Sequence, residues 1–152
     1  MSTNKAKYME RPWLKFYLKE VPPDIDISEQ SVVQTFNEAT EKWKNKTAGI
    51  FYGRKISYGE LRDQTDRFAT ALCDLGIKKG DKVALLLLNC PQFIIAYFGA
   101  LKAGAILTAI SPVYVSSEIK HQIEDSGANT IICQDILYDH IEDANVKLDR
   151  VI

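Results

Sequence analysis

The sequence has no apolar run long enough to span a membrane and no glycine-rich phosphate-binding loop. Its longest apolar runs, such as residues 83–88, are far shorter than the about 20 residues that a spanning helix needs. Its eight glycines are dispersed, and neither G-x-G-x-x-G nor G-x-x-x-x-G-K-[ST] occurs. These absences exclude a membrane span and argue against a Rossmann dehydrogenase.

The chain also has few cysteines and no excess of either charge. Cys73, Cys90 and Cys133 are odd in number and form no C-x-x-C pair, which argues against a zinc site and a disulfide framework and favours a reducing compartment. The net charge of −1 leaves no basic footprint for nucleic acid. No apolar segment follows the first residues, so no secretory signal is visible. We therefore expect a cytoplasmic protein that binds no nucleic acid.

Motifs for nucleophilic or acid–base catalysis are missing as well. No G-x-S-x-G elbow occurs, and His121 and His140 are predicted on exposed helix faces. Glu124 and Asp125 are neighbours on a predicted helix, so their carboxylates point apart. Cys90 follows a strand and precedes a helix, where reactive thiols occur, but a small packing residue is the favoured interpretation. The chain is predicted to contain no catalytic residue and no metal site.

What the sequence does contain is the composition of a globular domain. Its 152 residues are 46% apolar and 26% charged. Residues 1–27 are predicted to form an N-terminal arm with Trp13, Phe16 and Tyr17, ended by two prolines. Residues 28–152 are predicted to form an α/β portion, which begins with a helix opened by Ser28.

Helical and strand patterns alternate through that portion. Residues 47–52 and 55–56 are predicted strands joined by Gly53-Arg54 as a type II′ turn. Ser57 and Glu60 fit a capping box that begins a helix. Further strands are predicted at residues 83–88 and 105–110, both buried, and at 130–133 and 150–152. Helices are predicted from Asn89–Pro91, from Ser116 or Ser117 to Ser126, and from Asp135 to about Asp143, with Gly76, Gly104 and Gly127 as helix stops.

This alternation predicts an α/β fold with a mainly parallel sheet that is flanked by helices on both faces. Val151 and Ile152 resemble a strand cut short, so we expect a fragment of a longer protein. Its unpaired strand and uncovered apolar face favour self-association.

Two segments, in this order, carry a resemblance to a known family. Residues 56–61 (Ile-Ser-Tyr-Gly-Glu-Leu) resemble the first core motif of the adenylate-forming, or AMP-binding, enzymes, and residues 101–112 resemble the second. Residues 75–84 are similar to the segment that links the motifs. The chain resembles the fatty-acid–CoA ligases (acyl-CoA synthetases) most closely. The residues that carry this resemblance are 12–14, 21–22, 111–114, 118–119 and 125–128, and the similarity extends from about Arg11 to Ile152.

The resemblance implies a larger adenylate-forming N-terminal domain and a two-step reaction. A medium- or long-chain fatty acid and ATP give an acyl-adenylate and pyrophosphate, with Mg²⁺ offsetting phosphate charge, and coenzyme A then displaces AMP to form a thioester. The family's phosphate loop and catalytic lysine lie downstream of the part that this chain resembles. The chain alone is therefore expected to be inactive and to bind none of these cofactors.

The resemblance assigns site residues only near coenzyme A. Relatives approach the coenzyme A nucleotide with the region that corresponds to Pro112, Val113 and Tyr114. Structural roles are expected for the motif residues Ser57, Tyr58, Glu60 and Gly104.

Two other classes of function stay open. The chain is also compatible with a standalone doubly wound binding or interaction domain. Another adenylate-forming enzyme, such as an aryl-CoA ligase or a luciferase-like oxidase, would share both core motifs.

Overall fold

The computed structural model describes residues 10–27 and 29–152, and the chain divides into Met1–Gln30 and Ser31–Ile152. In the first unit, Pro12–Phe16 form a short 3₁₀ helix, η1. The Arg11 guanidinium donates to both carboxylate oxygens of Asp24, at 2.9 and 2.7 Å, and thereby lowers the pKa of Asp24. This ion pair joins the two ends of the segment from Arg11 to Asp24, which contains η1 and the two adjacent prolines, and closes it into a loop.

The second unit begins with helix α2 (Val32–Lys42), which starts later than the sequence predicts. Ser28, the predicted cap, lies outside the described residues. The cap is Ser31, whose hydroxyl accepts from the Gln34 N–H at 3.2 Å while the Gln34 side chain accepts from the Ser31 N–H at 2.8 Å. The prediction was wrong because two serines lie just before the helix in the sequence and only Ser31 has a glutamine three positions later.

A hairpin of β1 (Thr47–Phe51) and β2 (Arg54–Ser57) follows, and its turn is also not the predicted one. Phe51 pairs with Arg54, so Tyr52 and Gly53 form the two-residue turn. Both have positive φ angles, 47° and 82°, as a type I′ turn requires. The predicted type II′ turn at Gly53-Arg54 is wrong by one residue, because the positive φ at Tyr52 is unusual for an aromatic side chain.

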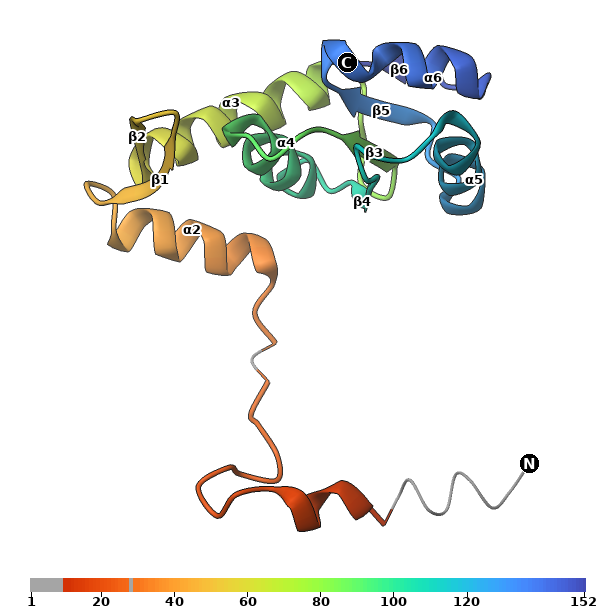
Figure 1. Ribbon diagram of the computed structural model, residues 1–152. Coiled ribbons are helices and arrows are strands. Elements are labelled where there is room, and N and C mark those ends of the chain that lie inside the picture. The colour runs from red at the N-terminus through yellow and green to blue at the C-terminus, as the bar shows by residue number, and fades with distance from the viewer. Residues whose placement is uncertain (1–9, 28) are drawn as a thin grey trace. The chain divides into compact units, whose positions relative to one another are not determined.

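Helix α3 (Tyr58–Asp74) leads into a four-stranded parallel sheet with the order β4-β3-β5-β6 (Figure 1). The strands are β3 (Lys82–Leu86), β4 (Ile106–Ala109), β5 (Thr130–Cys133) and β6 (Arg150–Val151). The connecting helices are α4 (Pro91–Lys102), α5 (Ser116–Ser126), η2 (Asp135–Leu137) and α6 (Tyr138–Ala144). The predicted α/β class and the parallel sheet are confirmed.

Helices cover both faces of the sheet, as predicted. Alternate residues of β3 point to opposite faces. Ala84 and Leu86 join a core with α5, η2 and α6, whereas Val83 and Leu85 join a core with α3 and α4. Both cores are fully enclosed at β3, which explains its uninterrupted apolar sequence.

The structure corrects two further predictions. The predicted buried strand at 105–110 is β4 at the sheet edge, where Ile106 is 56% exposed. Helix α5 is not capped by Ser116 or Ser117, because its cap residue is Val115, whose N–H donates to the Glu118 carboxylate at 3.0 Å.

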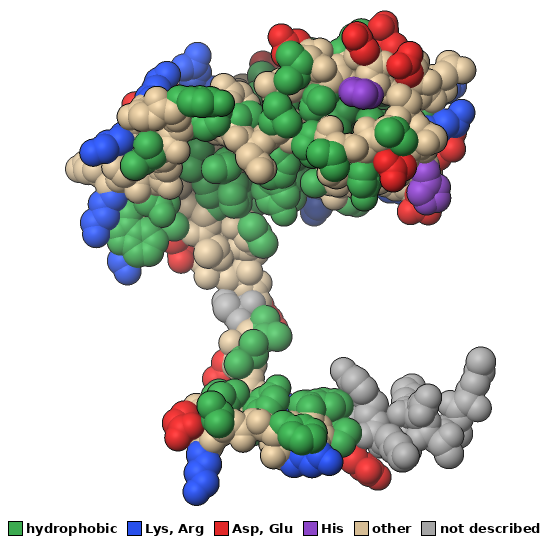
Figure 2. All heavy atoms as spheres, viewed as in Figure 1, with side chains coloured by type: hydrophobic (Ala, Val, Ile, Leu, Met, Phe, Trp, Pro, Cys, Tyr) green, Lys and Arg blue, Asp and Glu red, His purple; other side chains and the backbone are tan. Residues whose placement is uncertain are grey.

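Apolar side chains reach the surface of this unit in several places, as the visible face in Figure 2 shows. The hairpin contributes Ile50 and Tyr52, and α4 contributes Ile94. Within residues 10–27 and 29–152, no helix is both long enough and apolar enough to cross a membrane.

Candidate functional site

The first sequence motif caps helix α3. The Ser57 hydroxyl accepts from the Glu60 N–H at 3.1 Å, and the Glu60 carboxylate accepts from the Ser57 N–H at 2.8 Å. These bonds confirm the predicted capping box. The Ser57 N–H and the Ser57 hydroxyl, the latter at 2.9 Å, both donate to the Glu60 carboxylate and lower the pKa of Glu60, because they favour its charged form. The Tyr58 ring lies 5.9 Å from the Trp43 ring, between centroids. The side chains of Ser57, Glu60 and Tyr58 therefore each have a partner within the chain.

The second motif residue, Gly104, lies at the amino edge of the sheet. It follows α4 with a φ of 86°, and its carbonyl accepts from the Gly80 N–H at 2.9 Å. A Cβ at this position would lie 3.0 Å from Cα of Lys79. Gly104 thus ends α4 and lets the turn before β3 approach the turn before β4.

The predicted coenzyme A region lies at the opposite edge, after the carboxyl end of β4. Pro112 and Val113 form a turn closed by the Tyr114 N–H, which donates to the Ser111 carbonyl at 3.1 Å. Val113 is 84% exposed and Tyr114 is 37% exposed. Tyr114 borders a polar cleft of about 570 Å³ whose other walls come from α5: Ser117, Glu118, His121, Gln122 and Asp125.

The predicted residues therefore lie in three separate places. Ser57, Tyr58 and Glu60 share one helix end, Gly104 lies at the amino edge of the sheet, and Pro112–Tyr114 lie at the carboxyl edge. Both predicted surface histidines, His121 and His140, are exposed.

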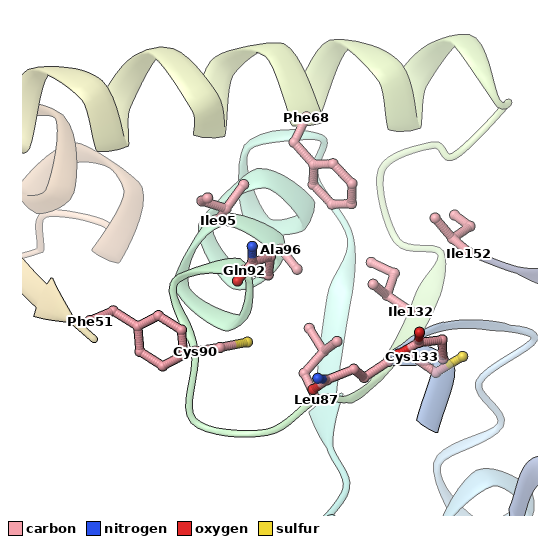
Figure 3. Close-up of a pocket in the computed structure, with 12 residues that line it drawn as sticks. Phe51, Phe68, Leu87, Cys90, Gln92, Ile95, Ala96, Ile132, Cys133 and Ile152 are labelled. Carbon is pink, nitrogen blue, oxygen red and sulfur yellow. The ribbon is translucent and has the colours of Figure 1, made fainter. Parts of the chain in front are cut away.

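A second cavity, which the sequence did not indicate, opens at the carboxyl ends of β3 and β5 (Figure 3). Its volume is about 570 Å³. Phe68 points into it from α3, Ile95 and Ala96 border it from α4, and Leu87 and Ile132 close it from the sheet. The other lining residues are Phe51, Cys90, Gln92, Cys133, Gln134, Asp135 and Ile152.

The chain after β5 returns to the end of β3 at this cavity. The Gln134 N–H donates to the Leu86 carbonyl at 3.1 Å, and the Gln134 side-chain oxygen accepts from the Leu88 N–H at 3.4 Å. Burial and the nearby Asp135 carboxylate raise the pKa of the Cys133 thiol. The sequence indicated Cys90 between a strand and a helix, and the end of a strand at Cys133. It did not bring the two together, because the adjacency of β5 and β3 depends on strand order.

Neither the cavity at the ends of β3 and β5 nor the cleft beside Tyr114 offers a cation for the phosphates of a nucleoside triphosphate. No lysine or arginine lines the cavity at the ends of β3 and β5, and no such residue lines the cleft beside Tyr114. In the part of the chain that the structure describes, no three His, Cys, Asp or Glu side chains group closely enough to hold a metal ion. A phosphate chain needs cations or clustered N–H groups.

Comparison with known proteins matches residues 36–151 to the model of one family, the AMP-binding enzymes. The chain is 32% identical over 129 residues to a long-chain-fatty-acid–CoA ligase of Bacillus subtilis, over 85% of this chain and 23% of that protein. It is 38% identical over 126 residues to a long-chain-fatty-acid–CoA ligase of Yersinia pestis, over 82% of this chain and 22% of that protein. The chain thus spans less than a quarter of the length of these relatives.

The fold is also found among solved structures. A long-chain-fatty-acid–CoA ligase of Archaeoglobus fulgidus matches with a TM-score of 0.78 over 90% of this chain and 30% of that chain. Its sequence identity is 22%, so this match shows only that the two chains share a fold.

Proposed function

Because the chain belongs to the AMP-binding enzyme family, we propose that it forms the N-terminal part of an ATP-dependent fatty-acid–CoA ligase for medium- or long-chain substrates. One observation carries this proposal: the similarity to two long-chain-fatty-acid–CoA ligases covers 82–85% of the chain. Both core motifs fall inside the matched family segment. The proposed compartment is the cytoplasm.

The proposed reaction is the formation of an acyl-adenylate and pyrophosphate, followed by transfer of the acyl group to the thiol of coenzyme A with release of AMP. Mg²⁺ is proposed for the whole enzyme. The cavity and the cleft beside Tyr114 hold no cation for the phosphates, and the described residues contain no group of three metal-ligating side chains, so we assign no catalytic step to them. We expect the 152-residue chain alone to be inactive.

The described residues have positioning roles in this proposal. The capping box fixes the start of α3, and Gly104 sets the approach of the two turns at the amino edge. Pro112, Val113 and Tyr114 are proposed to lie near the coenzyme A nucleotide, since this turn is exposed and Tyr114 offers a ring on which a base can stack. We further propose that residues 1–27 act as an arm separate from residues 28–152.

An activity assay tests the proposal directly. The protein encoded by the complete reading frame is given ATP, coenzyme A and either a graded series of fatty acids or an aryl acid. We expect pyrophosphate release and thioester formation with the fatty acids. Thioester formation with the aryl acid alone would assign the protein to another branch of the family, and no acid-dependent pyrophosphate release with any substrate would refute a ligase.

The same assay tests the coenzyme A region and the inactivity of the short chain. Tyr114→Ala should raise the KM for coenzyme A and leave the KM for the fatty acid unchanged, whereas the matched variant Tyr138→Ala should change neither. Equal effects of both variants would contradict a role at the coenzyme A site. Pyrophosphate release by the 152-residue chain would contradict the expected inactivity.

A further inference from the structure

The cavity lies at the carboxyl ends of β3 and β5, the two neighbouring strands whose outgoing connections run to opposite edges of the sheet. From β3 the chain passes through α4 to β4 on one side, and from β5 it passes through η2 and α6 to β6 on the other side. Sheets of this kind bind ligands outside the carboxyl ends of the strands at this switch point. The cavity therefore occupies the position at which an open α/β sheet forms a binding site.

The size and walls of the cavity indicate a small ligand with an apolar body. Its volume of about 570 Å³ lies within the range of about 300–1,000 Å³ that is typical of small-molecule sites. Aromatic and aliphatic side chains form most of the wall in Figure 3: Phe51, Phe68, Leu87, Ile95, Ala96, Ile132 and Ile152.

The polar residues on the lining determine which head group fits. Gln92 and Gln134 carry side-chain amides that can both donate and accept hydrogen bonds. Asp135 is the charged residue among those that line the cavity, and it is negative. Residues 83–101, which include all of β3 and α4 except Lys82 and Lys102, contain no charged side chain. An anionic head group would find no lysine or arginine on the lining to balance its charge and would lie near the Asp135 carboxylate, and an uncompensated charge is costly to remove from water.

We propose that this cavity is a binding site for a neutral small molecule with an alkyl or aryl body and an amide-like head group. The head group exchanges hydrogen bonds with the Gln92 and Gln134 amides, and the body lies between α3, α4 and the sheet. The site is distinct from the proposed coenzyme A turn, and it does not depend on the proposed ligase activity. A free fatty-acid carboxylate is disfavoured as its ligand.

The three cysteines provide a direct test on the 152-residue chain. Cys90 and Cys133 line the cavity, whereas Cys73 is exposed elsewhere and serves as an internal control. The rate at which iodoacetamide alkylates each cysteine is measured by mass spectrometry, with octanamide or octanoate as the probe. At ten times its dissociation constant, octanamide leaves about one site in eleven empty, so alkylation of Cys90 should slow roughly tenfold.

A preference for a neutral over an anionic probe distinguishes a specific site from a nonspecific apolar surface. Octanamide should protect Cys90 at concentrations at least about tenfold lower than octanoate does, because the carboxylate stays unpaired in the cavity. Cys73 should react at the same rate with either probe. Equal protection by both probes would overturn the proposed head-group preference. No protection of Cys90, or equal protection of Cys73, would overturn the site.

A pair of variants then assigns the recognition to the lining. Gln134→Ala should reduce the preference for octanamide over octanoate, and the matched control Gln122→Ala, outside the cavity, should retain it. Circular dichroism checks that both variants fold. An unchanged preference in folded Gln134→Ala would contradict the role of this amide. The comparison of the two probes on the unaltered chain decides the proposal even where a variant fails to fold.

Discussion

Replacing Gly104 by alanine should destabilise the chain more than the same replacement at Gly80. Both glycines have a positive φ, 86° and 90°, which costs an alanine about 1–2 kcal/mol. At Gly80 the new Cβ meets nothing within 4 Å. At Gly104 it meets Cα of Lys79 at 3.0 Å and Cβ of Lys79 at 3.1 Å, closer than ordinary contact. Relieving this overlap moves backbone and adds about 1–3 kcal/mol.

Urea unfolding of the two variants measures this difference. The conformational cost is common to both positions, so the difference isolates the contact with Lys79. We expect Gly104→Ala to lower the free energy of unfolding by at least about 1 kcal/mol more than Gly80→Ala does. With a slope of about 1–3 kcal/mol per molar urea, the two midpoints should differ by at least about 0.3 M. Coincident midpoints at equal slopes would refute the argument that Gly104 is required by the close approach of the two turns.

Three further predictions concern stability and association. The Ser57 N–H donates to the Glu60 carboxylate and lowers the pKa of Glu60, so the contribution of this carboxylate to stability is present above its unfolded pKa of about 4.3 and is lost as the pH falls through the lower folded pKa. The stability difference between the unaltered chain and Glu60→Gln should therefore shrink on acidification. A constant difference in thermal melts would contradict this. Asp66→Ala should destabilise the chain more than Lys102→Met does. The Lys102 ammonium donates to the Asp66 carboxylate, and the Lys102 side chain is only 10% exposed, so removal of the carboxylate leaves a poorly solvated positive charge without its counter-charge. The reverse order of stabilities in chemical denaturation would contradict this. The 152-residue chain should self-associate through its exposed apolar side chains, and a clean monomer at high concentration in light scattering would count against this.

The sequence predicts most elements of this fold because their signals are local. The capping box of Ser57 and Glu60 depends on two side chains three residues apart, and Gly76, Gly104 and Gly127 end helices through their own positive φ angles. The uncharged run at 83–88 predicts a strand that is buried on both faces, and β3 is such a strand. In each case the information lies within one turn of helix or one strand.

What the sequence does not reveal depends on long-range order. β3 and β5 are neighbours although β4 lies between them in the chain, and β4 occupies the edge despite its apolar sequence. The cavity is therefore assembled from segments that are distant in the chain, such as those of Leu87 and Ile132, and it has no motif of its own. Similarly, the hairpin register depends on a positive φ at Tyr52, which sequence preference disfavours.

The core motifs and the cavity are nevertheless physically connected, through the contact between α3 and α4. The first motif begins α3 and the second ends α4, and the ion pair between Asp66 and Lys102 joins the two helices. The helices pack so closely that a Cβ on Gly99 would lie 2.8 Å from the Phe68 ring. Phe68 and Ala96, from these same two helices, line the cavity. No residue of either motif lines the cavity, so the motifs are connected to it only through the packing of α3 against α4, which supply two of its walls.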